Sequence, residues 1–408
     1  MRTASIRLFV LLLAVTVLTS CQIGPRLLPS SAAHYSDAVR VAQSEELLVN
    51  LVRLRYRDLP VFLAVTSIST QFEFGANASV GGVLPEGDDD VLDLGLGAEY
   101  SERPTVTFGV LNGSSFEREM LEPIRMNTIA LLVESGWRAD RVLRLTVEGL
   151  NGVSHAGTAS GPTPTREPEF RDFQRAMRLL RDLVDRGSAR LDFEYREQTI
   201  SDPIPRSQIS GDDLIVAAKA GIKFKRSAVD SEYEPYLEER RLVLRFLPAA
   251  TEDPAAADFR ELLRLDPSLD AVDIVTLDQT STASRAPGER YTELVCDTRS
   301  LQGVLYFLSH AVEATAEELD TGVVTKTMRA SGEPFDWNDL FDGLFRVAST
   351  NSRPKGAPLA VRHRDRWFSV DGSDQSSRST LLLLRHLFTL QSGERASVKP
   401  VLTLPVGQ

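Results

Sequence analysis

A period of two in the apolar residues between Phe62 and Val110 constrains the fold of this chain more than any other feature. Mostly apolar residues occupy the even positions from Phe62 to Val80, and again from Leu92 to Val110, while polar residues and glycines alternate with them. Such alternation is typical of strands with one apolar and one polar face. Because turn-forming residues fill 84–90 between the two arms, the sequence predicts a long antiparallel hairpin over 62–110.

The arms of this hairpin are near twenty residues each, whereas strands in globular domains have about five or six. One interpretation is that the apolar face covers the chain's own helices, as in any half-buried antiparallel sheet. The alternative is a membrane-engaging oligomer in which hairpins from several chains form a barrel, since about ten residues per strand suffice to span a bilayer. We favour the first interpretation, and the size of the detergent-extracted protein would distinguish the two.

The first 21 residues have the organisation of a secretory signal. Arg2 and Arg7 precede an apolar run from Leu8 to Val17, which is too short for a permanent membrane helix, and the run is followed by Leu-Thr-Ser-Cys. This segment resembles the bacterial lipoprotein signal. The resemblance implies that residues 1–20 are removed and that Cys21 becomes an N-terminus carrying acyl chains such as palmitate, which anchor the protein to a membrane.

The residues after the cysteine bear on the location. Gln22 stands where, in the lipoproteins that this signal resembles, an aspartate commonly marks retention at the inner membrane. The resemblance therefore implies the cell envelope, and within it the outer membrane of a Gram-negative bacterium. Residues 21–35 contain two prolines and a Ser/Ala run, and we expect a lipidated tether there.

Charge and cysteine content narrow the possible partners. Removal of residues 1–20 takes away two of the 46 Lys and Arg and none of the 57 Asp and Glu, which leaves a net charge of −13. An acidic body disfavours nucleic acid and anionic lipid headgroups as partners, and no nucleic-acid partner is predicted. With Cys21 lipidated, Cys296 has no partner within the chain, so the fold needs no disulfide.

The remaining pattern predicts an α+β fold of mainly antiparallel strands with packed helices, including the long N-terminal hairpin. We expect the signal peptide (1–20) and tether (21–35) to be followed by a helix, hairpin and helices (36–151), a Gly/Pro linker (152–169), an α+β domain (170–290) and a C-terminal α+β region (291–408) that can be continuous with it. The expected helices lie near 36–56, 116–121, 126–135, 137–150, 170–187, 212–220, 258–265, 298–312, 335–345 and 381–390.

The sequence predicts no catalytic, cofactor-binding or metal-binding residue. The five histidines do not have zinc-site spacing, and the interpretation favoured for His310 and His386 is structural. Cys296 follows a predicted strand and is most simply a small buried hydrophobe. Asp88–Asp90 does not fit the calcium-loop pattern. The one predicted site is therefore the lipidation site, Cys21.

Five segments resemble an uncharacterised family of proteobacterial outer-membrane lipoproteins with no known activity; they are residues 47–67, 100–116, 299–309, 366–371 and 400–407. The resemblance implies an envelope lipoprotein and no catalytic residue. The function that we predict is that of a lipid-anchored, non-enzymatic protein of the envelope, facing the periplasm, with a structural or protein-binding role and envelope proteins as partners. The alternatives are the membrane-engaging oligomer and an envelope hydrolase whose site is assembled in space; the oligomeric state is not predicted.

Overall fold

The computed structural model describes residues 23–83, 91–228, 231–277 and 289–392, and for 23–35 and 64–106 it describes the backbone alone. Contacts divide the chain into two units. One, which we call the hairpin unit, includes the start of helix α2 up to Glu46 and residues 61–113. The other, which we call the body, consists of Leu47–Pro60 and Ser114–Gly393. Cys21 and residues 401–405, whose sequence predicts a closing strand, lie outside the described residues.

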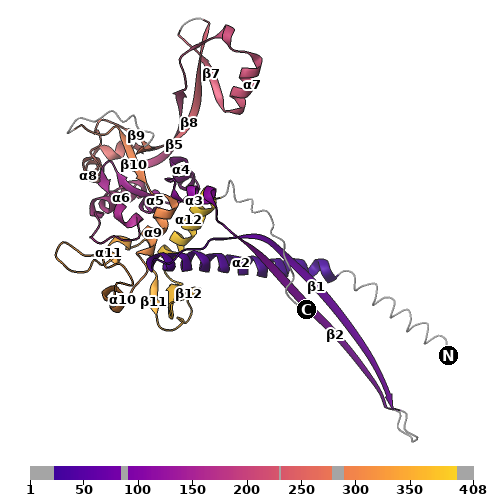
Figure 1. The fold of residues 1–408 in the computed structure, drawn as a ribbon. Coiled ribbons are helices and arrows are strands. Elements are labelled where there is room, and N and C mark those ends of the chain that lie inside the picture. The colour runs from indigo at the N-terminus through magenta and orange to yellow at the C-terminus, as the bar shows by residue number, and fades with distance from the viewer. Residues whose placement is uncertain (1–22, 84–90, 229–230, 278–288, 393–408) are drawn as a thin grey trace. The chain divides into compact units, whose positions relative to one another are not determined.

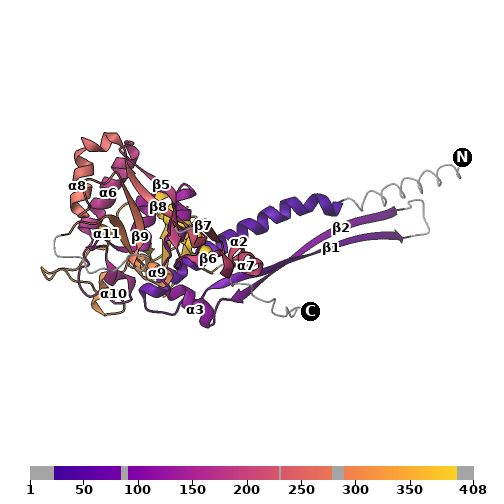
Figure 2. The ribbon, with the colours of Figure 1, turned by 90° about the horizontal axis from the view of Figure 1, so that it is seen from above.

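The hairpin unit contains strands β1 (Leu63–Val83) and β2 (Val91–Val110), which run antiparallel beside one another over their whole length (Figures 1 and 2). Their register places apolar residues opposite apolar residues, for example Phe74 opposite Tyr100 and Val80 opposite Leu94. A bulge between Val65 and Ser67 shifts the register by one residue. On the other side of the bulge, Val110 lies opposite Leu63. Apolar residues therefore still lie opposite apolar residues, although those of β1 are at odd positions there.

Helix α2 (Ile23–Arg55) begins thirteen residues before the start that the sequence predicts. Its last turns belong to the body, where Leu48, Leu51 and Val52 are fully buried. Arg53, Arg55 and Arg57 near this end of the helix have the spacing in sequence of a charged cluster, which predicts a solvated face. Arg55 is instead buried, and its Nη1 lies 3.2 Å from Nδ1 of His310. Among the described residues, none of the helices has the combination of length and apolar character that crossing a membrane requires.

The main sheet of the body has the strand order β4-β3-β10-β9-β8-β5. The β9–β10 pair is parallel and the other pairs are antiparallel. The strands are β3 (Val147–Leu150), β4 (Val153–Ser154), β5 (Ala189–Thr199), β8 (Glu232–Phe246), β9 (Ala271–Thr276) and β10 (Glu293–Thr298). A second, three-stranded antiparallel sheet contains β11 (Ala348–Thr350), β12 (Leu359–His363) and β13 (Arg366–Val370), in the order β11-β13-β12.

The helices complete an α+β fold, which confirms the predicted fold class. The described helices of the body are α3 (Ser114–Leu121), α4 (Met126–Glu134), α5 (Ala139–Thr146), α6 (Arg171–Asp185), α7 (Gly211–Lys219), α8 (Pro254–Leu262), α9 (Leu301–Ser309), α10 (Ala316–Asp320), α11 (Asn338–Phe341) and α12 (Gln375–Ser392). Residues 335–345, expected to be one helix, form only the single turn α11. The helix expected to reach residue 150 ends at Thr146, and β3 follows directly.

The N-terminal half of β8 carries a small module that the hydrophobic pattern did not reveal as one structure. There β8 pairs with β6 (Ile204–Pro205) and β7 (Ile222–Arg226), and α7 packs against β7 (Figure 1). Ser210 and Asp213 form a capping box at the start of α7. Leu214, Ile215 and Val216 of this helix are about half exposed or more, in contrast to the buried stripes of α6 and α9.

The core of the body is organised around α9 and the residue two positions before it, Arg299. The guanidinium of Arg299 is fully buried and donates to the carbonyl oxygens of Val147 and His155 and, at 3.0 Å, to Oγ of Ser160. It also lies over the ring of Phe307, with Cζ 4.1 Å from the centroid. Burial lowers the pKa of Arg299 to about 9, so the side chain is still charged at neutral pH. One side chain therefore joins β3, the segment after it and α9.

We expect Arg299→Met to lower the free energy of unfolding by about 3 kcal/mol, because it leaves two buried carbonyl groups without a donor. Urea unfolding followed by circular dichroism measures the change. Arg190→Met is the matched control, since Arg190 is exposed and pairs with Asp192 on the surface; its cost should stay below about 1 kcal/mol. Equal costs for the two variants would contradict the role assigned to Arg299.

Candidate binding groove

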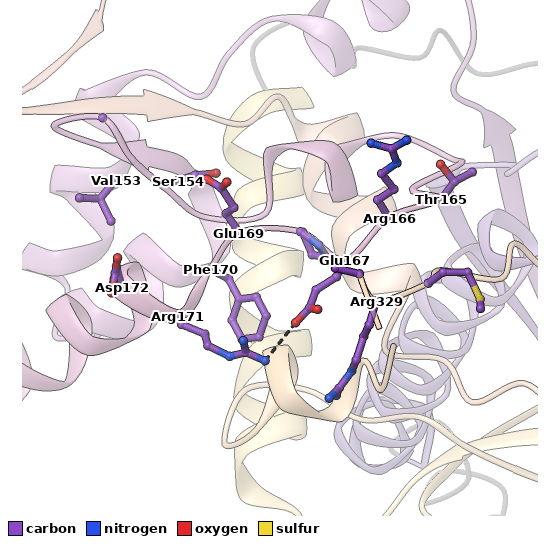
Figure 3. A pocket seen from close by; sticks show the side chains of 14 residues that line it. Val153, Ser154, Thr165, Arg166, Glu167, Glu169, Phe170, Arg171, Asp172 and Arg329 are labelled. Carbon is purple, nitrogen blue, oxygen red and sulfur yellow. Dashed lines mark hydrogen bonds and ion pairs between the residues drawn. The ribbon is translucent and has the colours of Figure 1, made fainter. Parts of the chain in front are cut away.

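An open groove of about 870 Å³ lies on the body. Three segments that are distant in sequence line it, namely 152–154, 165–172 and 328–330 (Figure 3). Its volume lies within the range of small-ligand sites, and its open mouth also admits a segment of polypeptide. None of these three segments was predicted to contribute to a site.

Backbone pairing holds the walls of the groove in place. The N–H of Met328 donates to the carbonyl of Thr165 at 3.0 Å, and the N–H of Glu167 donates to the carbonyl of Met328 at 2.8 Å. These bonds make a short parallel bridge between Arg166 and Met328. On the other side of the segment, the N–H of Ala156 donates to the carbonyl of Glu169 at 2.7 Å. An extended stretch of chain is thereby tied on both sides.

The base of the groove is aromatic. Phe170 is buried and meets Phe335 edge to face at 5.9 Å between centroids, and Phe335 meets Trp337 in the same way at 5.1 Å. Trp337 stacks on His310 at 4.5 Å. Offset and edge-to-face contacts of this kind contribute stability beyond the area they bury. The groove therefore rests on a rigid part of the core.

Charged side chains of both signs line the walls. Arg171 and Glu167 turn toward each other and form an ion pair at 3.0 Å (Figure 3). Arg329 forms an ion pair at 2.7 Å with Asp339, which lies outside the groove lining. Three exposed residues of the lining, Arg166, Glu169 and Asp172, make no ion pair with another described side chain. The groove thus presents one cation and two anions to whatever enters it.

The histidines nearest the groove are not placed for acid-base chemistry in it. His155, next to Ser154, is buried, stacks on Phe173 at 4.1 Å and has Nε2 2.9 Å from the carbonyl oxygen of Arg144. Burial, with the nearby Arg299 charge, lowers the pKa of His155 well below its ordinary value. Burial likewise lowers the pKa of His310 to about 3. Both rings are neutral at physiological pH, so His310 does not act as a cation at the end of α9.

Cys296 and His386, the other residues weighed from the sequence, do not line the groove. Cys296 is fully buried on β10, and burial raises its pKa to about 12, which suits a small hydrophobe and not a nucleophile. His386 is exposed and meets the edge of Trp137 at 5.8 Å. Within the ranges that the structure describes, no three His, Cys, Asp or Glu side chains converge as metal ligands would. Cys21, the predicted lipidation site, lies outside those ranges.

Comparison of the chain with protein-family models, with curated proteins and with solved structures finds no match in any of the three. The resemblance to outer-membrane lipoproteins noted in five segments of the sequence therefore stays a prediction. The groove has to be interpreted from its own residues.

The two buried histidines predict a specific pH dependence of stability. The unfolded chain binds a proton on each ring below about pH 6.5, whereas the folded chain does not, so the free energy of unfolding falls as the pH is lowered. Between pH 6.5 and 5.5, above the range in which carboxylates titrate, the slope should approach about 1.4 kcal/mol per pH unit for each ring. Urea unfolding at several pH values measures it.

His310→Asn should remove about half of this slope, and His386→Asn is the matched control because His386 is exposed. Proton uptake on unfolding at pH 5.5, measured by calorimetry in buffers of different ionisation enthalpy, gives an independent value. A slope that His310→Asn leaves at the wild-type value would show that His310 is not held neutral in the fold.

Proposed function

We propose that this chain is a lipoprotein of the bacterial envelope, anchored to the outer membrane through Cys21, whose body binds a segment of another envelope protein in the groove. The role is non-enzymatic. The signal-like N-terminus supports the anchor, and the groove supports the binding role.

The observation that carries the binding role is the set of exposed charges, Arg166, Glu169 and Asp172, that line an open groove and have no ion-pair partner among the described side chains. Charged groups arranged in this way give an interface its orientation and its choice of partner. A polypeptide segment supplies charges of both signs together with backbone donors and acceptors, whereas a purely apolar ligand would leave these charges desolvated and unpaired.

The lining does not favour hydrolysis. Glu169 and Asp172 are exposed, and Glu167 is held by Arg171, so none of these carboxyl groups lies in the enclosed, apolar surroundings of a general acid. The hydroxyls of Ser154 and Thr165 lack an available histidine base, because His155 is buried against Phe173.

The anchor is tested by Cys21→Ser. We expect the wild-type chain to take up radiolabelled palmitate and to sediment with outer membranes, and the variant to do neither, because a thioether cannot form on serine. Cys296→Ala is the matched control and should keep both the label and the membrane location, since Cys296 is buried within the fold. Label that persists on the Cys21→Ser chain would refute the anchor.

The binding role is tested by crosslinking in cells that make the protein. A photoreactive residue in place of Thr165, in the groove, should capture a discrete protein that a probe at Thr251, exposed and outside the groove lining, does not capture. Exchange of the charges, Arg166→Glu with Glu169→Arg, should lower the yield about tenfold at unchanged net charge.

The control exchange is Arg175→Asp with Asp258→Arg, a surface ion pair of 2.9 Å away from the groove lining, and it should leave the yield unchanged. Capture at Thr165 that is insensitive to the charge exchange in the groove, or equally sensitive to the control exchange, would overturn the proposal.

A further inference from the structure

A second cavity of the body, about 400 Å³, lies where α5 and α6 pack against each other. Five arginines line it: Arg138, Arg141, Arg144, Arg178 and Arg181. The first three lie three residues apart, at the start of α5 and along it, and the other two lie three residues apart on α6. Both helices therefore direct cations toward the same cavity. This concentration of positive charge stands out in a chain whose net charge is −11.

The two inner arginines bond to neutral groups. Arg141 donates to the carbonyl of Ser376 and to Oγ1 of Thr380, both at 3.0 Å. Arg144 donates to the carbonyl of Asp342 at 2.8 Å. These bonds hold the loop after α11 and the start of α12, but a carbonyl dipole does not cancel a full positive charge.

Burial lowers the pKa of Arg144 to about 10; the charges of Arg141 and Arg178 act in the same direction, and those of Asp140 and Asp342 oppose it. The pKa of Arg141 is also lowered, chiefly by burial. A negatively charged group placed in the cavity would relieve this repulsion.

The carboxylates of the lining do not provide full compensation. Asp140 pairs with Arg138 at 3.0 Å, and Asp339 pairs with Arg329 of the binding groove at 2.7 Å. Asp342 is the third carboxylate of the lining, so five arginines face three aspartates there. The lining therefore carries two positive charges in excess, which carboxylates outside it offset in part: Asp185 pairs with Arg138 at 3.4 Å, and the charge of Asp374 acts on Arg141.

The outer arginines have donors to offer. Arg178 is exposed and makes no hydrogen bond or ion pair with another described residue, and Arg181 reaches Asp182 only at 3.8 Å. The guanidinium group binds phosphate oxygens in bidentate fashion, which makes arginine the residue of choice for such groups. The free fork of Arg178, the loosely paired fork of Arg181 and the two partly buried charges of Arg141 and Arg144 suit a ligand of at least two negative charges.

We propose that the cavity between α5 and α6 binds a small molecule through a phosphate or pyrophosphate group, with Arg178 and Arg181 as the direct contacts and Arg141 and Arg144 supplying the positive field behind them. The cavity volume is enough for a phosphate with a substituent of modest size. This site differs from the groove, and its test does not depend on the proposed envelope role.

The test is titration calorimetry of the full chain in detergent with inorganic pyrophosphate, at constant ionic strength set by chloride. We expect binding that Arg178→Glu with Arg181→Glu weakens at least tenfold, the loss expected when two charge-assisted contacts are replaced by repulsion. Both residues are exposed, so the double variant should fold, which its thermal unfolding midpoint checks.

The matched control is Arg175→Glu with Arg186→Glu, which makes the same charge change at the same helix but outside the cavity lining. It should change the affinity by no more than about twofold, the effect of long-range charge alone. Two further probes distinguish the source of the phosphate. Tighter binding of glycerol phosphate indicates a soluble phosphate ester, and tighter binding of phosphatidylglycerol carried in the same detergent micelles indicates a lipid headgroup.

Either preference supports the proposal. Pyrophosphate binding no stronger than that of chloride, or an equal loss of affinity in the two double variants, would overturn it.

Discussion

The fold of the body depends on one buried guanidinium, that of Arg299. Its donors reach the carbonyls of Val147 and His155 and the hydroxyl of Ser160, while its backbone N–H bonds to the carbonyl of Thr146 at 2.7 Å. A hydrocarbon side chain could fill the same volume but would leave those acceptors desolvated and without donors. Gly303 allows the same close approach from α9, because a Cβ there would meet Cβ of Ser160 at 3.3 Å. The end of β3, the segment after it and α9 are thereby held as one block, on which the groove is built.

Arginine is used repeatedly in this way. Of the 46 basic residues, 40 are arginine and six are lysine. Arg55, Arg141, Arg144 and Arg299 are buried or partly buried, and the hydrogen bonds they donate go to carbonyls, hydroxyls or a neutral histidine. A planar fork of five donors can satisfy several carbonyls at once and keeps its charge when desolvated, which a lysine ammonium does less well. The consequence is internal positive charge within an acidic protein, and it is greatest where α5 meets α6.

Local periodicity predicted the α+β class, the hairpin and most helices, because these depend on neighbours two to four residues apart. It did not predict the first half of β8, since Glu232–Leu237 is partly buried throughout, with Pro235 buried, and shows no alternation of buried and exposed residues. It also predicted one helix over 335–345, where the carbonyls of Leu340 and Asp342 instead accept from Arg144. The expectation that Arg55 lies on an exposed face was wrong for a similar reason, since its partner His310 is 255 residues away in the sequence.

The groove could not be predicted from the sequence for a related reason. Its walls meet through the bridge between Arg166 and Met328, which no local pattern encodes. Residues 152–169, rich in glycine and proline, have the composition of a linker, yet His155, Ala159 and Pro168 among them are buried and the segment supplies much of the lining. The composition of such a segment indicates how freely its backbone can bend. Whether it forms part of a site depends on its hydrogen bonds, here those to Met328 and the one between Ala156 and Glu169 within the segment.

The groove and the arginine cavity share one structural element, the loop that includes α11 and ends at Gly343. Asp339 in this loop pairs with Arg329 on the groove wall and also lines the cavity. Gln174 of α6 donates to the carbonyl of Leu340 at 2.9 Å, which ties the loop to the helix that supplies Arg171 to the groove and Arg178 to the cavity. Asp339 is therefore the residue at which the two sites meet, because its carboxylate holds Arg329 of the groove and also belongs to the lining of the cavity.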